Sequence, residues 1–469
     1  MVRFNRRQFI ALGTAGVGSA LVGNWLRQDI SGQSVTSAPV DPTFLYQSKN
    51  GLLELDLEAR ESLVSLGDRQ VSLLTYNGQV PAPRLEAKPG DKVCIHFTNN
   101  LEQPTNIHYH GLHIPLTGNA DNVFLHIKPK EKLTYEFQIP NNHPSGTFWY
   151  HPHLHGLVAE QLFGGLAGLF IVRGEDEEIP ELKAVQEEFL VLQDFALDSE
   201  GKRSSSAHMS LMMGREGEII AVNGQVNPSL NLSRGGLLRL RILNASPSRF
   251  YRLALEDHAF YHIATDGNSL NEPVEVNELL LTPGQRADIL VKGAVRPRAD
   301  DRRKGTRTKT DKESGQYRLL NLPYDRGSMG MMGGRGMMGS NLDEAIALAT
   351  VNYSSSVVPL ALPIKLNSIS LLPEPQTVRR FELNHGMSPG VGMAFLINGE
   401  YYQGDRLDTQ VKLNTVEDWE LINTGVMDHP FHIHGNAFQV ISRNGQSEPL
   451  LAGYGASKKR RNRSHPHLF

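Results

Sequence analysis

Residues 77–100 read NGQVPAPRLEAKPGDKVCIHFTNN, and this stretch decides the fold class because its pattern occurs three times. An Asn-Gly turn is followed by a connection rich in Pro or Gly, and then by an alternating strand that ends in Asn. The same order recurs in residues 223–245 and 398–424. Alternation with a period of two, punctuated by Gly, Asn and Pro, indicates β-strands.

The three copies are spaced by 146 and 175 residues, which predicts three related all-β domains. Many short strands with turn signals between them are typical of sandwiches and barrels. We predict a signal segment and linker at 1–41, a first domain at 42–175, a second at 176–326, a Met/Gly-rich linker at 327–343, an incomplete third domain at 344–452 and an aberrant basic tail at 453–469.

Composition sets limits on partners and on covalent cross-links. The 469 residues are 39% hydrophobic, which is enough for sizeable cores, and the formal net charge of −3 favours no nucleic-acid partner. Cys94 is the only cysteine, so an intrachain disulfide is impossible. It sits in an alternating apolar strand, where we expect it to be a core residue.

The N-terminus has the features of an export signal. Arg6-Arg7 and Phe9 precede the apolar run 11–23, and small residues follow near Ser37. The run is shorter than the roughly 20 residues of a spanning helix. The arginine pair resembles a twin-arginine signal, which implies the twin-arginine export machinery as a partner and a periplasmic or extracellular location. An uncleaved membrane anchor is the alternative.

Two segments depart from the strand pattern. Residues 296–312 are dense in charge and fit a solvated hairpin insertion, with a nucleic-acid role as the alternative. Residues 327–340 read GSMGMMGGRGMMGS. Thioethers favour Cu(I), so this stretch is either a copper-handling segment or a flexible Gly-rich linker. Met209, Met212 and Met213 add to the copper interpretation.

Three histidine clusters carry the chemistry, at 108–111, 149–156 and 429–435. Residues two apart in a strand point to the same side, so each His-x-His pair offers two imidazoles to one place. Imidazole suits copper, zinc, iron and nickel. The second domain has Phe-Tyr-Arg-Leu at 250–253 where the others have His-x-His, so the histidines are not required by the fold itself.

These clusters closely resemble the copper motifs of the multicopper oxidases, the family of laccases and bacterial cuprous oxidases. The resemblance spans residues from about 42 to 452 and covers three of the four family motifs, in order. It implies three cupredoxin-like Greek-key β-sandwich or barrel domains, with copper bound between the first domain and the third. It also implies one-electron oxidation of phenolic or metal-ion donors, among them Cu(I), coupled to reduction of dioxygen to water.

Carried over residue by residue, the resemblance implies seven ligands. They are His429 for the type 1 copper, His108 and His432 for the type 2 copper, His110 and His151 for one type 3 copper, and His153 and His434 for the other. Asp121 matches an acidic residue near the cluster in the family and is either a proton relay or a turn-forming Asp. His113 and His155 match no ligand position.

The fourth family motif, His-Cys-His followed by another His, is not found in this sequence. It would supply the type 1 thiolate, the second type 1 histidine and one more ligand to each type 3 copper. The residues after 452 instead form a basic stretch without strand alternation, which we interpret as out-of-frame translation or, alternatively, a polyanion-binding arm. We therefore expect an impaired oxidase, with a non-catalytic periplasmic copper-binding protein as the alternative.

Overall fold

The structure is a computed structural model that describes residues 45–183, 185–204, 214–294, 315–327, 344–388, 392–404 and 406–447. Contacts divide the chain into residues 1–38 and 39–469, and every described residue belongs to the second unit. The expected signal segment, the charged segment 296–312, nearly all of the Met/Gly-rich linker, Met209, Met212 and Met213, and the basic tail lie outside the described residues. Within those residues, no helix has the length and hydropathy that crossing a membrane requires.

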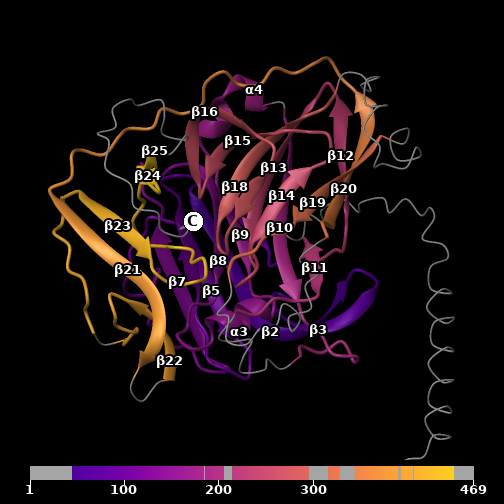
Figure 1. The fold of residues 1–469 in the computed structure, drawn as a ribbon. Coiled ribbons are helices and arrows are strands. Elements are labelled where there is room, and N and C mark those ends of the chain that lie inside the picture. The colour runs from indigo at the N-terminus through magenta and orange to yellow at the C-terminus, as the bar shows by residue number, and fades with distance from the viewer. Residues whose placement is uncertain are drawn as a thin grey trace, which may run out of the picture. The chain divides into compact units, whose positions relative to one another are not determined.

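The N-terminal part of the described chain forms two β-sheets that enclose one apolar core. The first sheet has the order β1-β4-β9-β8-β6, and the second the order β3-β2-β5-β7. Figure 1 labels β8 and β9 of the first sheet and the four strands of the second. Their bounds are β1 Leu45–Gln47, β2 Leu52–Leu66, β3 Arg69–Tyr76, β4 Arg84–Ala87, β5 Lys92–Asn99, β6 His108–His110, β7 Lys132–Gln138, β8 Gly146–His151 and β9 Gly168–Val172.

The middle part forms a second pair of sheets around its own core. The orders are β11-β10-β13-β18-β15-β16 and β12-β20-β19-β14-β17. The bounds are β10 Gln186–Phe195, β11 Ile219–Val222, β12 Ser229–Arg234, β13 Leu237–Asn244, β14 Tyr251–Leu255, β15 Phe260–Thr265, β16 Asn268–Val276, β17 Leu279–Leu281, β18 Arg286–Lys292, β19 Gln316–Leu322 and β20 Ile346–Ser356.

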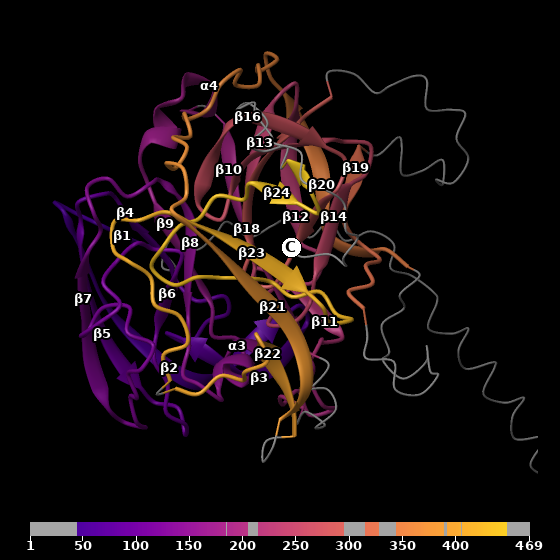
Figure 2. The ribbon, with the colours of Figure 1, turned by 60° about the vertical axis from the view of Figure 1, so that its left-hand side comes forward.

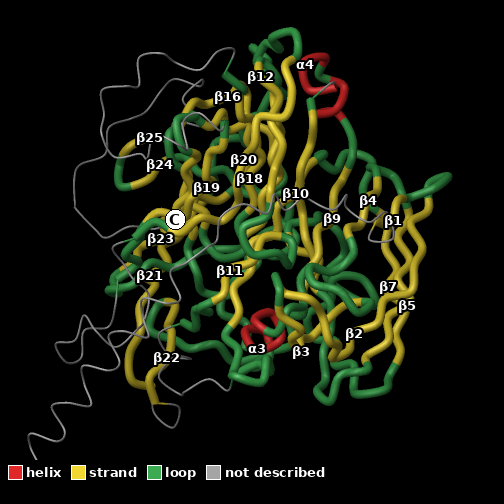
Figure 3. Tube along the Cα trace, turned by 90° about the vertical axis from the view of Figure 1, so that its right-hand side faces the viewer, coloured by secondary structure: helices red, strands yellow, loops and turns green. Residues whose placement is uncertain are grey.

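Helices are short and few among the described residues, as Figure 3 shows. They are α3 Val158–Phe163 and α4 Pro180–Lys183, together with the 3-10 turn η2 Glu175–Glu178. The nearly all-β architecture confirms the predicted fold class.

The described residues of the C-terminal part form fewer strands than those of the other two parts. It has one three-stranded sheet, β22-β21-β23, in which β21 lies between its two neighbours (Figure 2), and one short hairpin, β24-β25. The bounds are β21 Thr377–Ser388, β22 Gly392–Ile397, β23 Glu417–Asn423, β24 Ser442–Arg443 and β25 Gln446–Ser447. Large apolar side chains such as Met387, Phe395 and Leu413 are exposed in this part. The described residues of the third domain therefore leave apolar surface uncovered.

Strand β20 belongs to a different pair of sheets from the one that its position in the sequence suggests. The predicted third domain begins at residue 344, but β20 pairs in parallel with β12 and antiparallel with β19. It is therefore a strand of the second pair of sheets. We propose that the boundary between the second and third domains lies beyond Ser356.

The three Asn-Gly turns have the same geometry. Asn77, Asn223 and Asn398 have φ of 52°, 52° and 54°, and the glycines after them have φ of 78°, 71° and 83°. Two consecutive residues with positive φ fit a two-residue hairpin turn, in which Asn and Gly are the least strained residues. Each Asn side-chain oxygen also accepts a backbone N–H from another strand, donated by Glu58, Val191 and Glu382 respectively.

The asparagines that end the three repeated strands are also equivalent. Asn99, Asn244 and Asn423 are at most 1% exposed. Each oxygen accepts the backbone N–H two residues later, and each side-chain N–H₂ donates to a carbonyl of the following loop. A buried amide satisfied in this way shapes the loop after the strand. In the first and third domains that loop leads to the histidines.

The first core determines which way the histidines of β6 and β8 point. Tyr109 and Tyr150 are a cross-strand pair, and both are buried in this core. Because successive residues of a strand face opposite sides, His108, His110 and His151 point away from it. The packing of two tyrosines thus presents three imidazoles on the other face of the sheet.

Candidate metal centre

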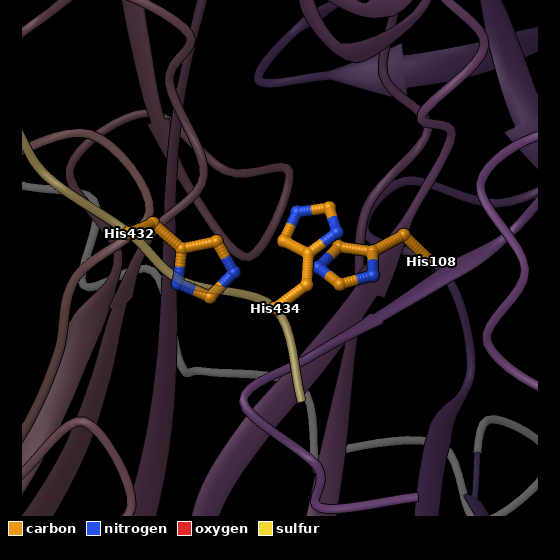
Figure 4. Close-up of side chains that lie close together, drawn as sticks. All are labelled: His108, His432 and His434. Carbon is orange, nitrogen blue, oxygen red and sulfur yellow. The ribbon is translucent and has the colours of Figure 1, made fainter. Parts of the chain in front are cut away.

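Six of the seven predicted ligands meet in one cluster, whose first-domain residues His108, His110 and His151 are buried. The ring centroids of His108 and His434 lie 4.1 Å apart, and those of His110 and His432 lie 3.7 Å apart. The rings of His151 and His153 lie 5.3 and 5.2 Å from the ring of His108. Figure 4 shows His432 and His434 reaching from the C-terminal ribbon toward His108 of the first domain. Residues more than 270 positions apart in the sequence therefore form one site.

The spacing of the donor nitrogens suits metal binding. His108, His432 and His434 each offer a ring nitrogen within 4.8 Å of the other two, and so do His108, His110 and His151. His108 belongs to both sets, so two adjacent positions for a metal ion share one part of the site. The grouping agrees with copper ions held close together.

A buried carboxylate orients His108. The ring Nδ1–H of His108 donates to Asp121 Oδ1 at 2.8 Å, and the same oxygen accepts the backbone N–H of Tyr109 at 2.9 Å. With the proton on Nδ1, the lone pair of Nε2 points into the site, where Nε2 is buried without a partner. Such a carboxylate–histidine pair is the usual way to orient a metal ligand.

Backbone and amide contacts hold two more histidines. His151 donates its Nδ1–H to the carbonyl of Pro152 at 2.9 Å, which leaves its Nε2 lone pair facing His110 Nδ1 at 3.4 Å. The backbone N–H of His153 donates to Asn106 Oδ1 at 2.7 Å. The amide of Asn106 in turn donates to two carbonyls of the loop that carries Asp121.

The imidazoles of the cluster are neutral. Burial holds the pKa of His108, His110 and His151 well below the usual histidine value, and neighbouring histidines lower it further. Burial and nearby imidazoles lower the pKa of His432 to about 2 and that of His434 to about 4. Neutral imidazole is the metal-binding form, so the site is ready to bind a cation near neutral pH.

Burial has the opposite effect on the carboxyl group of Asp121. Desolvation raises the pKa of Asp121 to about 6, against the lowering effect of the Tyr109 N–H. Its Oδ2 is buried and has no partner. Asp121 therefore has a free oxygen beside the site and a pKa near physiological pH, which is more than a turn-forming role requires.

The second domain, which supplies none of the predicted ligands, forms a wall of the site. Gly284 has φ of +80°, and a Cβ added there would lie 3.3 Å from His110 Cε1. Arg286 on β18 is fully buried and donates to the carbonyls of Thr147, Gly284 and Asp266. Its charge lowers the pKa of His108, His110 and His432.

Two histidines that match no ligand position make contacts between the first and third domains. Nδ1 of His113 is hydrogen-bonded to the carbonyl of Gly435, at the end of the third histidine motif. The ring of His155 packs 4.7 Å from that of Tyr402. These contacts attach the third domain to the first beside the cluster.

His429, the seventh predicted ligand, lies apart from the other six. Its ring centroid is 6.4 Å from that of His385 on β21 and 5.8 Å from that of Phe395 on β22. His429 Nε2 and His385 Nδ1 are both buried without partners. Burial lowers the pKa of His429, followed by the effect of His385.

The position of Cys94 determines whether a thiolate is available beside His429 for a type 1 copper. Cys94 is 9% exposed, but it lies on the opposite face of β5 from the core residues Val93 and Ile95 and contacts His96. The described residues therefore offer no thiolate to His429, and a His₂Cys blue-copper set does not fit there. The six imidazoles do fit copper at the cluster, where Nε2 of His108 is buried without a partner.

Several residues of the site were missed in the sequence analysis. Asn106 stands two residues before His108, but nothing in the pattern distinguishes it from an ordinary loop asparagine. Arg286 and Gly284 come from the domain without ligands, and His385 is an isolated histidine in a strand. Only spatial neighbours reveal such residues, because none has a characteristic spacing from a motif.

Family models described as multicopper oxidase match residues 58–177, 189–299 and 372–466 of this chain. The chain is 30% identical to the multicopper oxidase mco of Staphylococcus epidermidis, over 86% of this chain and 78% of that protein. It is 27% identical to the cell division protein FtsP of Proteus mirabilis, over 96% of this chain and 89% of that protein.

Solved structures give the same result. The structure of a multicopper oxidase from Campylobacter jejuni, described as a metallo-oxidase, is 30% identical in sequence. It superposes with a TM-score of 0.70 and covers 85% of this chain and 81% of that one.

Proposed function

The chain belongs to the multicopper oxidase family, and we propose that it couples one-electron oxidation of a phenolic or metal-ion donor to reduction of dioxygen to water. Copper is its cofactor, and oxidoreductase chemistry is the activity of the family. The observation that carries the proposal is the convergence of six neutral imidazoles from the first and third domains.

When bound, copper supplies the one-electron redox steps and a place for oxygen. The residues of the chain do three other things. His108, His110, His151 and His153 of the first domain and His432 and His434 of the third hold the ions. Burial keeps these imidazoles unprotonated, so acidification does not displace the metal until well below neutral pH. The packing of the first domain buries His108, His110 and His151.

We assign Asp121 two tasks. Through Oδ1 it holds the Nδ1 proton of His108, which keeps the Nε2 lone pair on the metal side. Through the unpaired Oδ2, and with a pKa of about 6, it can take up a proton near neutral pH and release it toward reduced oxygen. Reduction of oxygen to water consumes protons, so a carboxyl group that titrates near neutrality suits this position.

Electron entry is the step that we propose to be impaired in these 469 residues. His429 is the expected ligand of the type 1 copper, but Cys94 lies in another domain and cannot provide the thiolate. Without that thiolate, the donor site lacks its high-potential copper. We expect a protein that binds copper at the six-histidine cluster, lacks a blue colour and oxidises phenols slowly.

The electron donor remains a choice between two classes, a phenol or a metal ion. The methionines of residues 327–343 support Cu(I), because thioether sulfur is a soft ligand. Comparing oxidation rates for Cu(I) and for a phenol, before and after replacing these methionines by leucine, separates the two. A loss confined to Cu(I) supports the metal-ion donor, and unchanged rates exclude a role for the methionines.

The alternative function is a non-catalytic, periplasmic copper-binding protein of the same fold. It is favoured by the missing thiolate and by the similarity to a protein named for cell division rather than oxidation. Copper content distinguishes the two proposed functions. About four ions per chain indicate an intact oxidase, and at most two indicate a copper-binding protein. Export by the twin-arginine route would place either one outside the cytoplasm, and fractionating cells that express the chain tests this.

The deciding experiment measures copper content and oxygen uptake in the purified chain and in two variants. His432→Ala removes a nitrogen from the cluster and should lower both quantities. His126→Gln removes an exposed histidine of the same domain as β6 and should lower neither. Copper content that is the same in all three proteins would show that the cluster is not the copper site and would overturn the proposal.

A further inference from the structure

The outer face of the four-stranded sheet β3-β2-β5-β7 carries a second group of metal-ligating side chains. Val93, Ile95 and Phe97 of β5 face the first core, so Cys94 and His96 face outward. In the register of the sheet, Cys94 lies opposite Glu54 on β2 and opposite Glu136 on β7. Three neighbouring strands thus place a thiol, an imidazole and carboxylates on one surface.

The distances within this group match those of a single bound ion. His96 Nε2 lies 3.8 Å from Cys94 Sγ and 3.2 Å from Glu54 Oε1. All three donor atoms lie within 4.8 Å of one another. In a tetrahedral zinc site with ordinary bond lengths, sulfur and nitrogen are about 3.6 Å apart, and nitrogen and oxygen about 3.4 Å apart. The observed separations are within a few tenths of an ångström of these values.

A hydrogen bond orients His96 for this role. His96 Nδ1 lies 3.2 Å from Thr134 Oγ1 on β7. When Nδ1–H donates to that hydroxyl, the lone pair of Nε2 points between Cys94 and Glu54. Metal-bound histidines are oriented in this way by a partner on their other nitrogen. The ordinary alternative is a surface ion pair between protonated His96 and Glu54, whose side chains are 44% and 55% exposed.

The charges around the thiol favour a cation. Burial raises the pKa of Cys94, and the carboxylates of Glu54 and Glu136 raise it further, while Lys92 lowers it. The ammonium group of Lys92 is held by Glu136 at 2.9 Å. A divalent ion would neutralise this acidic surface and displace the thiol proton, so binding should strengthen as pH rises.

We propose that Glu54, Cys94 and His96 bind one zinc-like divalent ion on the outer face of the first domain, separate from the six-histidine cluster. The fourth position faces solvent and is free for water. A thiolate, an imidazole and a carboxylate are the donors that a borderline-soft tetrahedral ion prefers. The site uses only residues of the first domain, so the proposal does not depend on the proposed oxidase activity.

Because Cys94 is the only cysteine of the chain, a metal–thiolate signal reports on this site alone. Titration of the full-length, copper-loaded chain with Co²⁺ should produce the near-ultraviolet charge-transfer band of a cobalt–thiolate bond. We expect the band to saturate at one equivalent, and stoichiometric Zn²⁺ should abolish it. A correctly folded chain that gives no such band at neutral or mildly alkaline pH would overturn the proposal.

Variants test each donor separately. Cys94→Ser should abolish the band, and His96→Gln and Glu54→Gln should each weaken Co²⁺ binding severely. Thr134→Val should weaken it by about 10- to 100-fold, the usual effect of losing the partner that orients a ligand. His126→Gln, an exposed histidine of the same domain, should leave it unchanged. A band retained at full affinity in His96→Gln and Glu54→Gln would show that Cys94 binds the metal alone and would refute the three-residue site.

Discussion

Replacing Asp288 by alanine should destabilise the protein more than any exposed charge replacement, because Asp288 is the centre of a buried charge cluster between the first two domains. Its side chain on β18 is 2% exposed. It accepts the Thr147 hydroxyl of β8 at 2.6 Å, and the guanidinium of Arg239 lies 2.6 Å away. Arg241 is 3.4 Å away and 1% exposed.

The magnitude follows from what the substitution leaves behind. Asp288→Ala leaves two buried guanidinium groups with less compensating charge, and Arg239 Nε already lacks a hydrogen-bond partner. Breaking a buried ion pair from one side costs about 3–5 kcal/mol, against a total stability of about 5–15 kcal/mol for a typical domain. Glu200, paired with Lys202 at 69% and 67% exposure, is the control, and its loss should change stability by less than about 1 kcal/mol.

The pH dependence gives a second check on the same residue. Burial opposes ionisation of Asp288, but Arg241 and Arg239 outweigh it and lower its pKa below the usual aspartate value. A carboxyl group with a lowered folded pKa stabilises the fold above its unfolded pKa, and this contribution is lost only as pH falls through the folded value. The loss in free energy of unfolding caused by Asp288→Ala should therefore be equal at pH 6 and pH 8, within error.

Chemical denaturation of the copper-free wild type, Asp288→Ala and Glu200→Ala at both pH values measures these differences. Equal, small losses in the two variants would mean that the buried cluster contributes no more than a surface pair. A loss of stability that grows markedly from pH 8 to pH 6 would mean that the folded protein takes up a proton at Asp288, whose pKa would then be raised rather than lowered. Either result would refute the reasoning from burial and charge.

Four substitutions test the metal centre. Asp121→Asn keeps the size of the side chain but removes the charge that holds His108 Nδ1–H, so we expect copper affinity to fall by about 10- to 100-fold, measured by competition with a chelator. Gly284→Ala places a Cβ near the cluster in a left-handed conformation that costs about 1–2 kcal/mol, so both copper content and denaturation midpoint should fall. His429→Ala should leave the electron paramagnetic resonance signal of cluster copper intact, whereas His432→Ala should change it; equal effects would contradict the separation of His429 from the cluster.

The buried charge cluster also bears on the metal centre. Arg286 and Gly284 precede Asp288 by two and four residues along the chain, and both lie against the histidine cluster. The docking of β18 on β8 therefore sets both the stability of the domain boundary and one wall of the site. This explains how a domain that supplies none of the predicted ligands can contribute to metal binding.

Local patterns in the sequence were sufficient to predict the fold class, and they predicted seven metal ligands, six of which the fold brings together. The sequence predicts three equivalent turns at Asn77, Asn223 and Asn398, because positive φ at a hairpin strongly favours Asn and Gly. The His-x-His spacing predicts paired imidazoles, because side chains two residues apart in a strand point to the same face. Both signals are visible in sequence because each depends only on residues close together in the chain.

The tertiary structure decided what depends on distant parts of the chain. Strand β20 pairs with β12, although its position suggested the third domain, because hydrogen-bonded register and not sequence order assigns a strand to a sheet. Arg286 reaches the site from the second domain, and His385 is the histidine that accompanies His429. Cys94 alternates with core residues, but the same alternation turns it outward beside His96 and Glu54. Periodicity shows that two sets of side chains face opposite ways, and only the packing of one sheet on another shows which set lies inside.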